Sequence, residues 1–146
     1  MKRVVIDASV VLKWYLADER YGQVALSLLE DYLADEVDIL APSLLEYEVI
    51  NGLIIAQKRG RIKEKMILEA VEGFVNLGIN LRNIHLFFPK VLHYCQILHR
   101  SVYEASYLAL ADEEGISLIT ADEGLYNDVK KELKWVKWIN GIPKDL

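Results

Sequence analysis

Four acidic residues lie inside or directly beside apolar segments, where a carboxylate is costly unless it is paired, hydrogen-bonded or bound to a cation. They are Asp7 after Val4-Val5-Ile6, Glu48 within residues 44–55, Glu104 before residues 107–111, and Asp122 after Leu118-Ile119. Carboxylate oxygens suit Mg²⁺ or Mn²⁺ better than zinc. The four residues together predict one metal site that is assembled from separate segments and could activate a water for attack on a phosphodiester.

Two of these residues also have a local structural explanation. Asp7 could cap the N-terminus of a helix that begins near Ser9, although Ser9 is itself a residue type that caps helices. Asp122 could serve a turn between a strand and Gly124. From the sequence alone, Asp7 and Asp122 can therefore be metal ligands or residues with a purely local structural role.

Two glutamates, Glu46 and Glu48, are candidates for the metal ligand in the helix that is expected to start near Ser43. Glu46 stands three residues after Ser43, which is the spacing of a capping box, and this explains it without any chemistry. Glu48 has no capping role, and it shares a helical face with Asn51, three residues later. Glu48 is therefore the expected ligand, with Asn51 as its hydrogen-bonded support.

The remaining candidate residues also have structural explanations. Ser101 and Glu104 also have capping-box spacing, so local structure explains Glu104 as well as chemistry does. Asp128 is expected on a helix surface. The three histidines, His85, His93 and His99, lack the spacing of a zinc site. The three tryptophans, Trp14, Trp135 and Trp138, are expected in the core or an interface and not as platforms for base stacking.

Hydrophobic periodicity predicts short strands that alternate with helices. Strands are expected at residues 3–6, 38–41, 116–120 and 135–139, with a further strand and loop within 79–88; helices are expected at 9–16, 21–34, from a cap at Ser43 to near Gly60, and at 62–77, 90–99, 101–114 and 125–133. This alternation favours an α/β fold with a parallel sheet covered on both faces. Ligands of such sheets gather beyond the carboxyl ends of the strands, where Asp7 and Asp122 lie. The other two carboxylates join them if their helices start at the same edge.

Composition points to one globular domain, residues 1–146, because 53% of the residues are hydrophobic, which excludes a disordered class. No apolar run approaches the roughly 20 residues that span a bilayer. The apolar stretch after Met1-Lys2-Arg3 is too short for a secretion signal, so a soluble cytoplasmic protein is expected. Cys95 is the only cysteine, which excludes an internal disulfide and a cysteine-rich zinc site.

The net charge of −5, from 17 Lys and Arg against 22 Asp and Glu, disfavours indiscriminate binding to phosphate backbones. A nucleic-acid substrate would therefore need a local basic strip or a metal ion. Two strips are present: Lys58, Arg59, Arg61, Lys63 and Lys65, and then Lys130, Lys131, Lys134 and Lys137. Their simpler interpretation is solvated helix ends.

Four segments, in order, resemble the signature segments of PIN-domain ribonucleases, and most of all those of VapC-like toxins from prokaryotic toxin–antitoxin pairs. The segments are residues 5–9 (VIDAS), 42–51 (PSLLEYEVIN), 103–111 (YEASYLALA) and 118–122 (LITAD). Any one of them is a weak signal, but four in this order are specific. The resemblance extends from Val4 to about Ile139, which is nearly the whole chain.

The resemblance implies a PIN-like α/β/α sandwich with a central parallel sheet, and a ribonuclease that uses Mg²⁺ or Mn²⁺. It also implies an RNA substrate, a homodimer, and a small antitoxin protein that covers the acidic cleft. It assigns Asp7, Glu48, Glu104 and Asp122 as catalytic, metal-binding carboxylates, with Ser9, Asn51 and Thr120 as polar supports. One position departs from the family, which usually has aspartate where this chain has Glu104.

Other classes of function stay open beside the nuclease. A PIN-like scaffold weakened at Glu104 would act through protein or RNA binding. A phosphatase of the haloacid-dehalogenase type needs a second aspartate two residues after Asp7, where this chain has Ser9. The acidic pair and acceptor aspartate of a phospho-receiver domain are not evident. Cleavage of RNA with and without EDTA separates these hypotheses.

Overall fold

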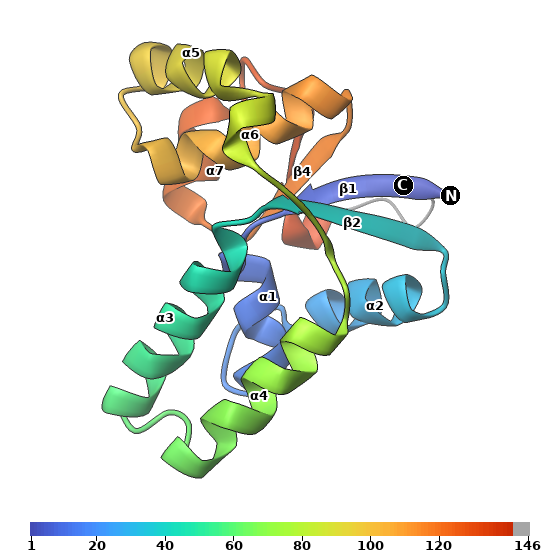
Figure 1. The fold of residues 1–146 in the computed structure, drawn as a ribbon, viewed down its shortest axis with the longest axis vertical. Helices are drawn as coiled ribbons and strands as arrows, with labels where there is room; N and C mark the ends of the chain where they lie inside the picture. The colour runs from blue at the N-terminus through green and yellow to red at the C-terminus, as the bar shows by residue number, and fades with distance from the viewer. Residues whose placement is uncertain (142–146) are drawn as a thin grey trace.

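The computed structural model, which describes residues 1–141, has a five-stranded sheet between two groups of helices (Figure 1). The strands are β1 (Lys2–Ile6), β2 (Val37–Pro42), β3 (Asn80–Arg82), β4 (Ser117–Thr120) and β5 (Val136–Trp138), in the spatial order β3-β2-β1-β4-β5. All four neighbouring pairs are parallel. The predicted α/β/α sandwich is confirmed. Residues 142–146 of the expected domain lie outside the described part.

The helices divide between the two faces of the sheet. The group α1 (Ala8–Tyr15), α2 (Gly22–Leu33), α3 (Leu45–Lys58) and α4 (Glu64–Asn76) lies on one side, and the group α5 (Phe88–Leu98), α6 (Val102–Glu114) and α7 (Glu123–Val129) lies on the other (Figure 1). Short 3-10 helices, η1 (Ile84–Leu86) and η2 (Ile139–Gly141), complete the described chain. Within residues 1–141, no helix combines the length and the apolar character needed to cross a bilayer.

The centre of the sheet is buried because helices cover both of its faces. Residues Val4, Val5 and Ile6 of β1 are at most 2% exposed, and α6 is buried from Ala105 to Ala111. Strands covered on both faces have nearly continuous apolar sequences, which explains why β1 could be located from its sequence. Helix α6 contacts β1, β2 and β4, so it spans the middle of the sheet.

The register of β1 and β4 fixes where the acidic residues begin to converge. Ile6 pairs with Ile119, so the two central strands end side by side. Asp7 directly follows β1, and Asp122 follows β4 by two residues. Helices α1 and α7 start at these strand ends, at the carboxyl edge where ligands of parallel sheets bind.

The capping box expected at Ser43 is wrong. Helix α3 begins at Leu45, and the capping position is occupied by Leu44, whose side chain makes no capping hydrogen bond. The Ser43 hydroxyl instead donates to the Arg82 carbonyl at 3.1 Å and to Asn83 Oδ1 at 2.9 Å. Ser43 directly follows β2, which pairs with β3. Its hydroxyl therefore bonds to residues at the end of β3 and does not cap the helix.

Candidate active site

All four predicted carboxylates line one cavity of about 140 Å³ at the carboxyl edge of the sheet. Asp7 comes from the end of β1, Glu48 from α3, Glu104 from the first turn of α6, and Asp122 from the segment between β4 and α7. Ser9 and Tyr107 also line the cavity. The structure therefore brings together side chains that are far apart in the sequence.

Asp7 is buried, with 7% of its surface exposed, and the surrounding chain fixes its orientation. It caps α1 by accepting a hydrogen bond from the Ser9 amide at 3.1 Å, and it accepts a second one from the Ser9 hydroxyl. The Thr120 hydroxyl donates to its other oxygen at 2.5 Å. Asp7, and not Ser9, is therefore the cap of α1. Ser9 and Thr120, two of the polar supports that the family resemblance implies, therefore both contact the Asp7 carboxylate.

The environment of Asp7 disfavours its negative charge. Burial raises the pKa of this carboxyl to about 6, and the negative charge of Asp122 adds to the effect. The hydrogen bonds from Ser9 and Thr120 lower the pKa but do not offset burial. A buried carboxyl of this kind favours a bound proton, or an arriving cation that compensates its charge.

Glu48 is partly buried and accepts a hydrogen bond from the Tyr107 hydroxyl at 2.5 Å. Burial raises the pKa of Glu48, the Tyr107 hydrogen bond opposes this, and the charge of Glu104 adds to it. Asn51, the expected support, is exposed, and the hydrogen bond comes from Tyr107 in its place. Tyr107 was missed in the sequence, although it stands three residues after Glu104 and so shares a helical face with it.

Only the Ser101 half of the expected capping box is formed at Glu104. Its backbone amide donates to the Ser101 hydroxyl at 3.2 Å, so Ser101 caps α6 as predicted. Its carboxylate binds the Arg100 guanidinium at 2.9 Å, while Arg100 also donates to the Gly124 carbonyl at 3.0 Å and to Asp128. Arg100 was also missed in the sequence. Its position four residues before Glu104 was the available signal.

Asp122 is exposed and caps α7, since it accepts a hydrogen bond from the Leu125 amide at 3.1 Å. Its own amide donates to the Thr120 hydroxyl at 3.1 Å. The capping role and a place in the cavity are thus compatible, as they also are for Asp7. Both aspartates are positioned by the start of a helix at the end of a central strand.

The other sequence candidates lie outside this cavity. The three histidines, His85, His93 and His99, are exposed and do not line it. Arg61, from the first basic strip, is engaged with Asp18 at 2.8 Å and Glu19 at 2.5 Å. This strip is therefore partly neutralised by acidic residues of the chain itself.

The carboxylates share a cavity without forming a ready-made metal site. Within residues 1–141, no three His, Cys, Asp or Glu side chains stand close enough together to hold an ion as they are. Asp7, Glu48, Glu104 and Asp122 are each engaged with a donor of the protein. The donor set consists of oxygens, which Mg²⁺ or Mn²⁺ prefers as ligands, and the carboxylates would move closer together to hold an ion.

An all-parallel sheet in this strand order, with acidic residues converging at its carboxyl edge, agrees with the family that the sequence resembles. Residues 4–131 match the family model described as the PIN domain, and the chain belongs to this family. A relative is Ribonuclease VapC3 of Pyrobaculum aerophilum, which is 28% identical over 137 residues, covering 84% of this chain and 92% of that protein.

Proposed function

We propose that this chain, as a single domain, is a ribonuclease that depends on Mg²⁺ or Mn²⁺ and acts as the toxin of a toxin–antitoxin pair. The observation that carries the proposal is the convergence of Asp7, Glu48, Glu104 and Asp122 on one cavity of a PIN-domain chain. The similarity to a protein named Ribonuclease VapC3 supports the choice of RNA as substrate.

The proposal gives each residue around the cavity a part in binding and orientation. Asp7, Glu48 and Asp122 would hold the divalent cation, and Glu104 would be a fourth ligand once free of Arg100. Ser9 and Thr120 orient the Asp7 carboxylate, and Tyr107 orients that of Glu48. These donors fix ligand geometry in the way that outer-shell partners do at metal sites.

The charge of the cavity makes a cation necessary for this substrate. Four carboxylates repel a phosphodiester, and the chain as a whole carries a formal charge of −5. A bound divalent cation supplies the positive charge that offsets this repulsion and lowers the pKa of water for attack on phosphorus. Asp7 gains most from this charge, because it is the buried member of the set.

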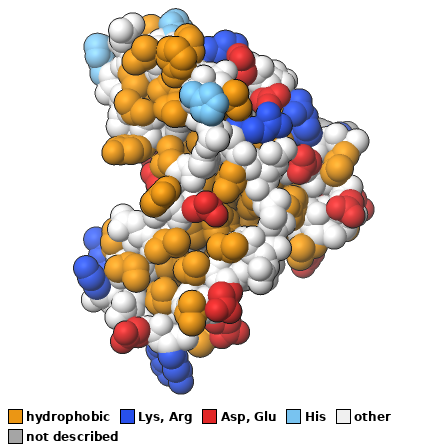
Figure 2. Space-filling view, viewed as in Figure 1, with side chains coloured by type: hydrophobic (Ala, Val, Ile, Leu, Met, Phe, Trp, Pro, Cys, Tyr) orange, Lys and Arg blue, Asp and Glu red, His pale blue; other side chains and the backbone are white. Residues whose placement is uncertain are grey.

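The proposal includes association with a second copy and with a small antitoxin protein. Apolar side chains gather over the α3–α4 pair and over the region of α5, on either side of a hollow (Figure 2). Exposed apolar residues on two of these helices are Ile50 and Ile55 on α3, and Leu92 and Ile97 on α5, which are between 38% and 53% exposed. Apolar surface of this kind supports an interface, and basic residues of an antitoxin would complement the acidic cavity.

The test is cleavage of RNA by the purified chain with Mg²⁺ or Mn²⁺ and with EDTA. Asp7→Asn and Glu48→Gln should lose more activity than the roughly 10- to 100-fold that loss of an outer-shell partner costs. Matched controls are Asp31→Asn on α2 and Glu46→Gln, which changes the same residue type on the same helix as Glu48. Both controls should cleave at the rate of the original chain.

Two outcomes would contradict the proposal. Cleavage that is unchanged in EDTA would remove the cation from the reaction, and equal rates for Glu48→Gln and Glu46→Gln would remove the assigned site. RNA binding without any cleavage would favour the alternative of a catalytically weakened PIN-like scaffold.

A further inference from the structure

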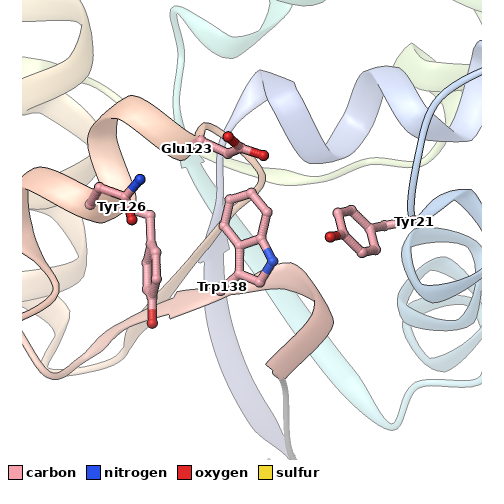
Figure 3. A pocket seen from close by; sticks show the side chains of 5 residues that line it. Tyr21, Glu123, Tyr126 and Trp138 are labelled. Atoms are coloured by element: carbon pink, nitrogen blue, oxygen red, sulfur yellow. The ribbon is translucent and has the colours of Figure 1, made fainter.

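A second cavity, of about 230 Å³, is lined by three aromatic side chains from three separate elements (Figure 3). Tyr21 precedes α2, Tyr126 lies on α7, and Trp138 ends β5. The Trp138 ring lies between the other two, with ring centroids 5.8 Å from Tyr21 and 5.5 Å from Tyr126. All three rings are only partly buried, so aromatic surface stays open to a ligand.

The backbone at Tyr21 takes an unusual conformation in this arrangement. Tyr21 has a φ of 62°, in the left-handed region that bulky residues rarely occupy. Such conformations persist where the surrounding structure imposes them, and they cluster at binding sites. Here the conformation accompanies an edge-on contact of the Tyr21 ring with Trp138, at an interplanar angle of 87°.

Cations flank the aromatic cavity although the chain is acidic overall. The Arg20 guanidinium lies 5.1 Å from the centre of the Tyr21 ring, and the Lys130 ammonium lies 5.8 Å from that of Tyr126. Arg20 also lines an adjoining cavity of about 260 Å³, together with Lys13, which is paired with Glu19 at 3.4 Å; this cavity shares Tyr21, Glu123 and Trp138 with the first. Aromatic rings with basic residues beside them are the features that bind single-stranded nucleic acid without strict sequence preference.

Neighbouring residues of the chain line the aromatic cavity and the acidic one. Ala121 lines the adjoining cavity, Asp122 lines the acidic cavity, and Glu123 lines the aromatic one. These three residues are consecutive, and each Cα step spans about 3.8 Å. A strand whose phosphate sits at the acidic cavity therefore has a neighbouring nucleotide within reach of the aromatic rings.

We propose that the cavity formed by Tyr21, Tyr126 and Trp138 binds an unpaired nucleobase of the RNA substrate next to the phosphate that is cleaved. This inference rests on the proposed ribonuclease function and adds a substrate-binding subsite to it. The base stacks on the exposed aromatic surface, so the proposal gives Trp138 a stacking role that the sequence did not predict, and Arg20 and Lys130 face the flanking phosphates. Glu123 accepts hydrogen bonds from an amino group of the base, and the Asn127 amide reads the base edge.

The test is binding of a short, fluorescein-labelled single-stranded RNA, followed by fluorescence anisotropy. All proteins carry Asp7→Asn, so that cleavage does not interfere. Adding Tyr126→Ala or Trp138→Ala should weaken RNA binding by roughly 5- to 100-fold, the effect of losing one stacked base. Trp138→Phe, which keeps a ring, should retain most of the affinity. Phe88→Ala, which removes an exposed aromatic side chain on α5, is the matched control and should bind like its parent.

Thermal melting of each variant identifies a loss of fold, and Tyr126→Ala with Trp138→Phe carries the test if Trp138→Ala fails to fold. In the background with Asp7 intact, Asn127→Ala should change the base preference at one position beside the cut, as read from the ends of the cleaved RNA.

Equal RNA affinity for Tyr126→Ala, Trp138→Ala and their parent would overturn the subsite. So would a changed molar mass in light scattering with unchanged RNA binding, which would make the cavity a protein interface. An intact chain that binds RNA through these rings but never cleaves it would overturn the ribonuclease proposal and leave the subsite standing.

Discussion

Asp7→Asn should remove the pH-dependent destabilisation that Asp7 imposes on the ion-free protein, while it abolishes activity. The Asp7 carboxyl has a folded-state pKa of about 6, against an ordinary value of 3.8. Between these two pH values the unfolded chain has lost the proton and the folded chain keeps it. The free energy of unfolding contributed by this group therefore falls as the pH rises from about 4 to about 6, and it is constant above that range. Asparagine does not titrate, so the free energy of unfolding of Asp7→Asn does not fall in this way between pH 4 and pH 6.

The size of the effect follows from the two pKa values. Each tenfold change in proton affinity corresponds to about 1.4 kcal/mol, so the interval from 3.8 to about 6 is worth about 3 kcal/mol. Asp7 is 7% exposed, so solvent does little to screen this effect. The exchange of hydrogen bonds with Ser9 and Thr120 adds an offset that does not depend on pH. The quantity to measure is therefore how the difference in free energy of unfolding between Asp7→Asn and the original chain changes with pH.

Urea unfolding of both proteins in EDTA, at a fixed protein concentration and at several pH values from 4 to 8, measures this difference. The free energy of unfolding of Asp7→Asn, minus that of the original chain, should rise by about 2.4 kcal/mol between pH 4 and pH 7, because about 0.6 kcal/mol of the full effect has already accrued at pH 4. Asp31→Asn on α2 is the control and should show no such rise. Saturating Mn²⁺ should then stabilise the original chain alone, by about 2.7 kcal/mol at 100 times the dissociation constant.

A difference that does not change with pH would refute the reasoning, because it would mean that burial does not perturb Asp7. Equal stabilisation of Asp7→Asn and the original chain by Mn²⁺ would refute the assignment of Asp7 as a ligand. The two results are independent, so the electrostatic argument and the metal argument can fail separately.

Two further predictions concern Glu104 and the oligomeric state. Glu104→Asp should preserve or increase cleavage, whereas Glu104→Gln should reduce it strongly. Glutamine can still accept a hydrogen bond from Arg100, so the melting temperature should change less than the cleavage rate. A fully active Glu104→Gln protein would limit Glu104 to its structural role beside Arg100. Light scattering at micromolar concentration should report a homodimer, and a monomer at high micromolar concentration would contradict the proposed association.

The sequence located the strands and helices because the buried elements have strong local patterns. Strand β1 is a continuous apolar run, since helices cover both of its faces. Helix α6 is capped by Ser101 and ends at Gly115, whose φ of 66° suits glycine. The parallel sheet then places Asp7 and Asp122 at one edge, which is why the carboxylates could be grouped from the sequence before their contacts were known.

The partners of the carboxylates were harder to predict, because they come from distant segments. Tyr107 is 59 positions from Glu48, and no local pattern connects the two residues. Thr120 and Asp7 are 113 positions apart and meet only because β1 and β4 are neighbours. At Ser43 a local capping pattern was present in the sequence, but no cap formed. The Ser43 hydroxyl instead bonds to the Arg82 carbonyl, 39 positions away.

Hydrogen bonds and an ion pair to the four carboxylates explain how the folded chain tolerates so acidic a cavity. The protein supplies a donor to each carboxylate: hydroxyls to Asp7 and Glu48, a helix amide to Asp122, and a guanidinium to Glu104. These donors reduce the cost of bringing four carboxylates together. Three of the donors can remain while an ion binds, because a carboxylate accepts several contacts. Arg100 differs, because its positive charge competes with a cation for Glu104. Its hydrogen bonds to Gly124 and Asp128 would hold the guanidinium in position when Glu104 turns toward an ion.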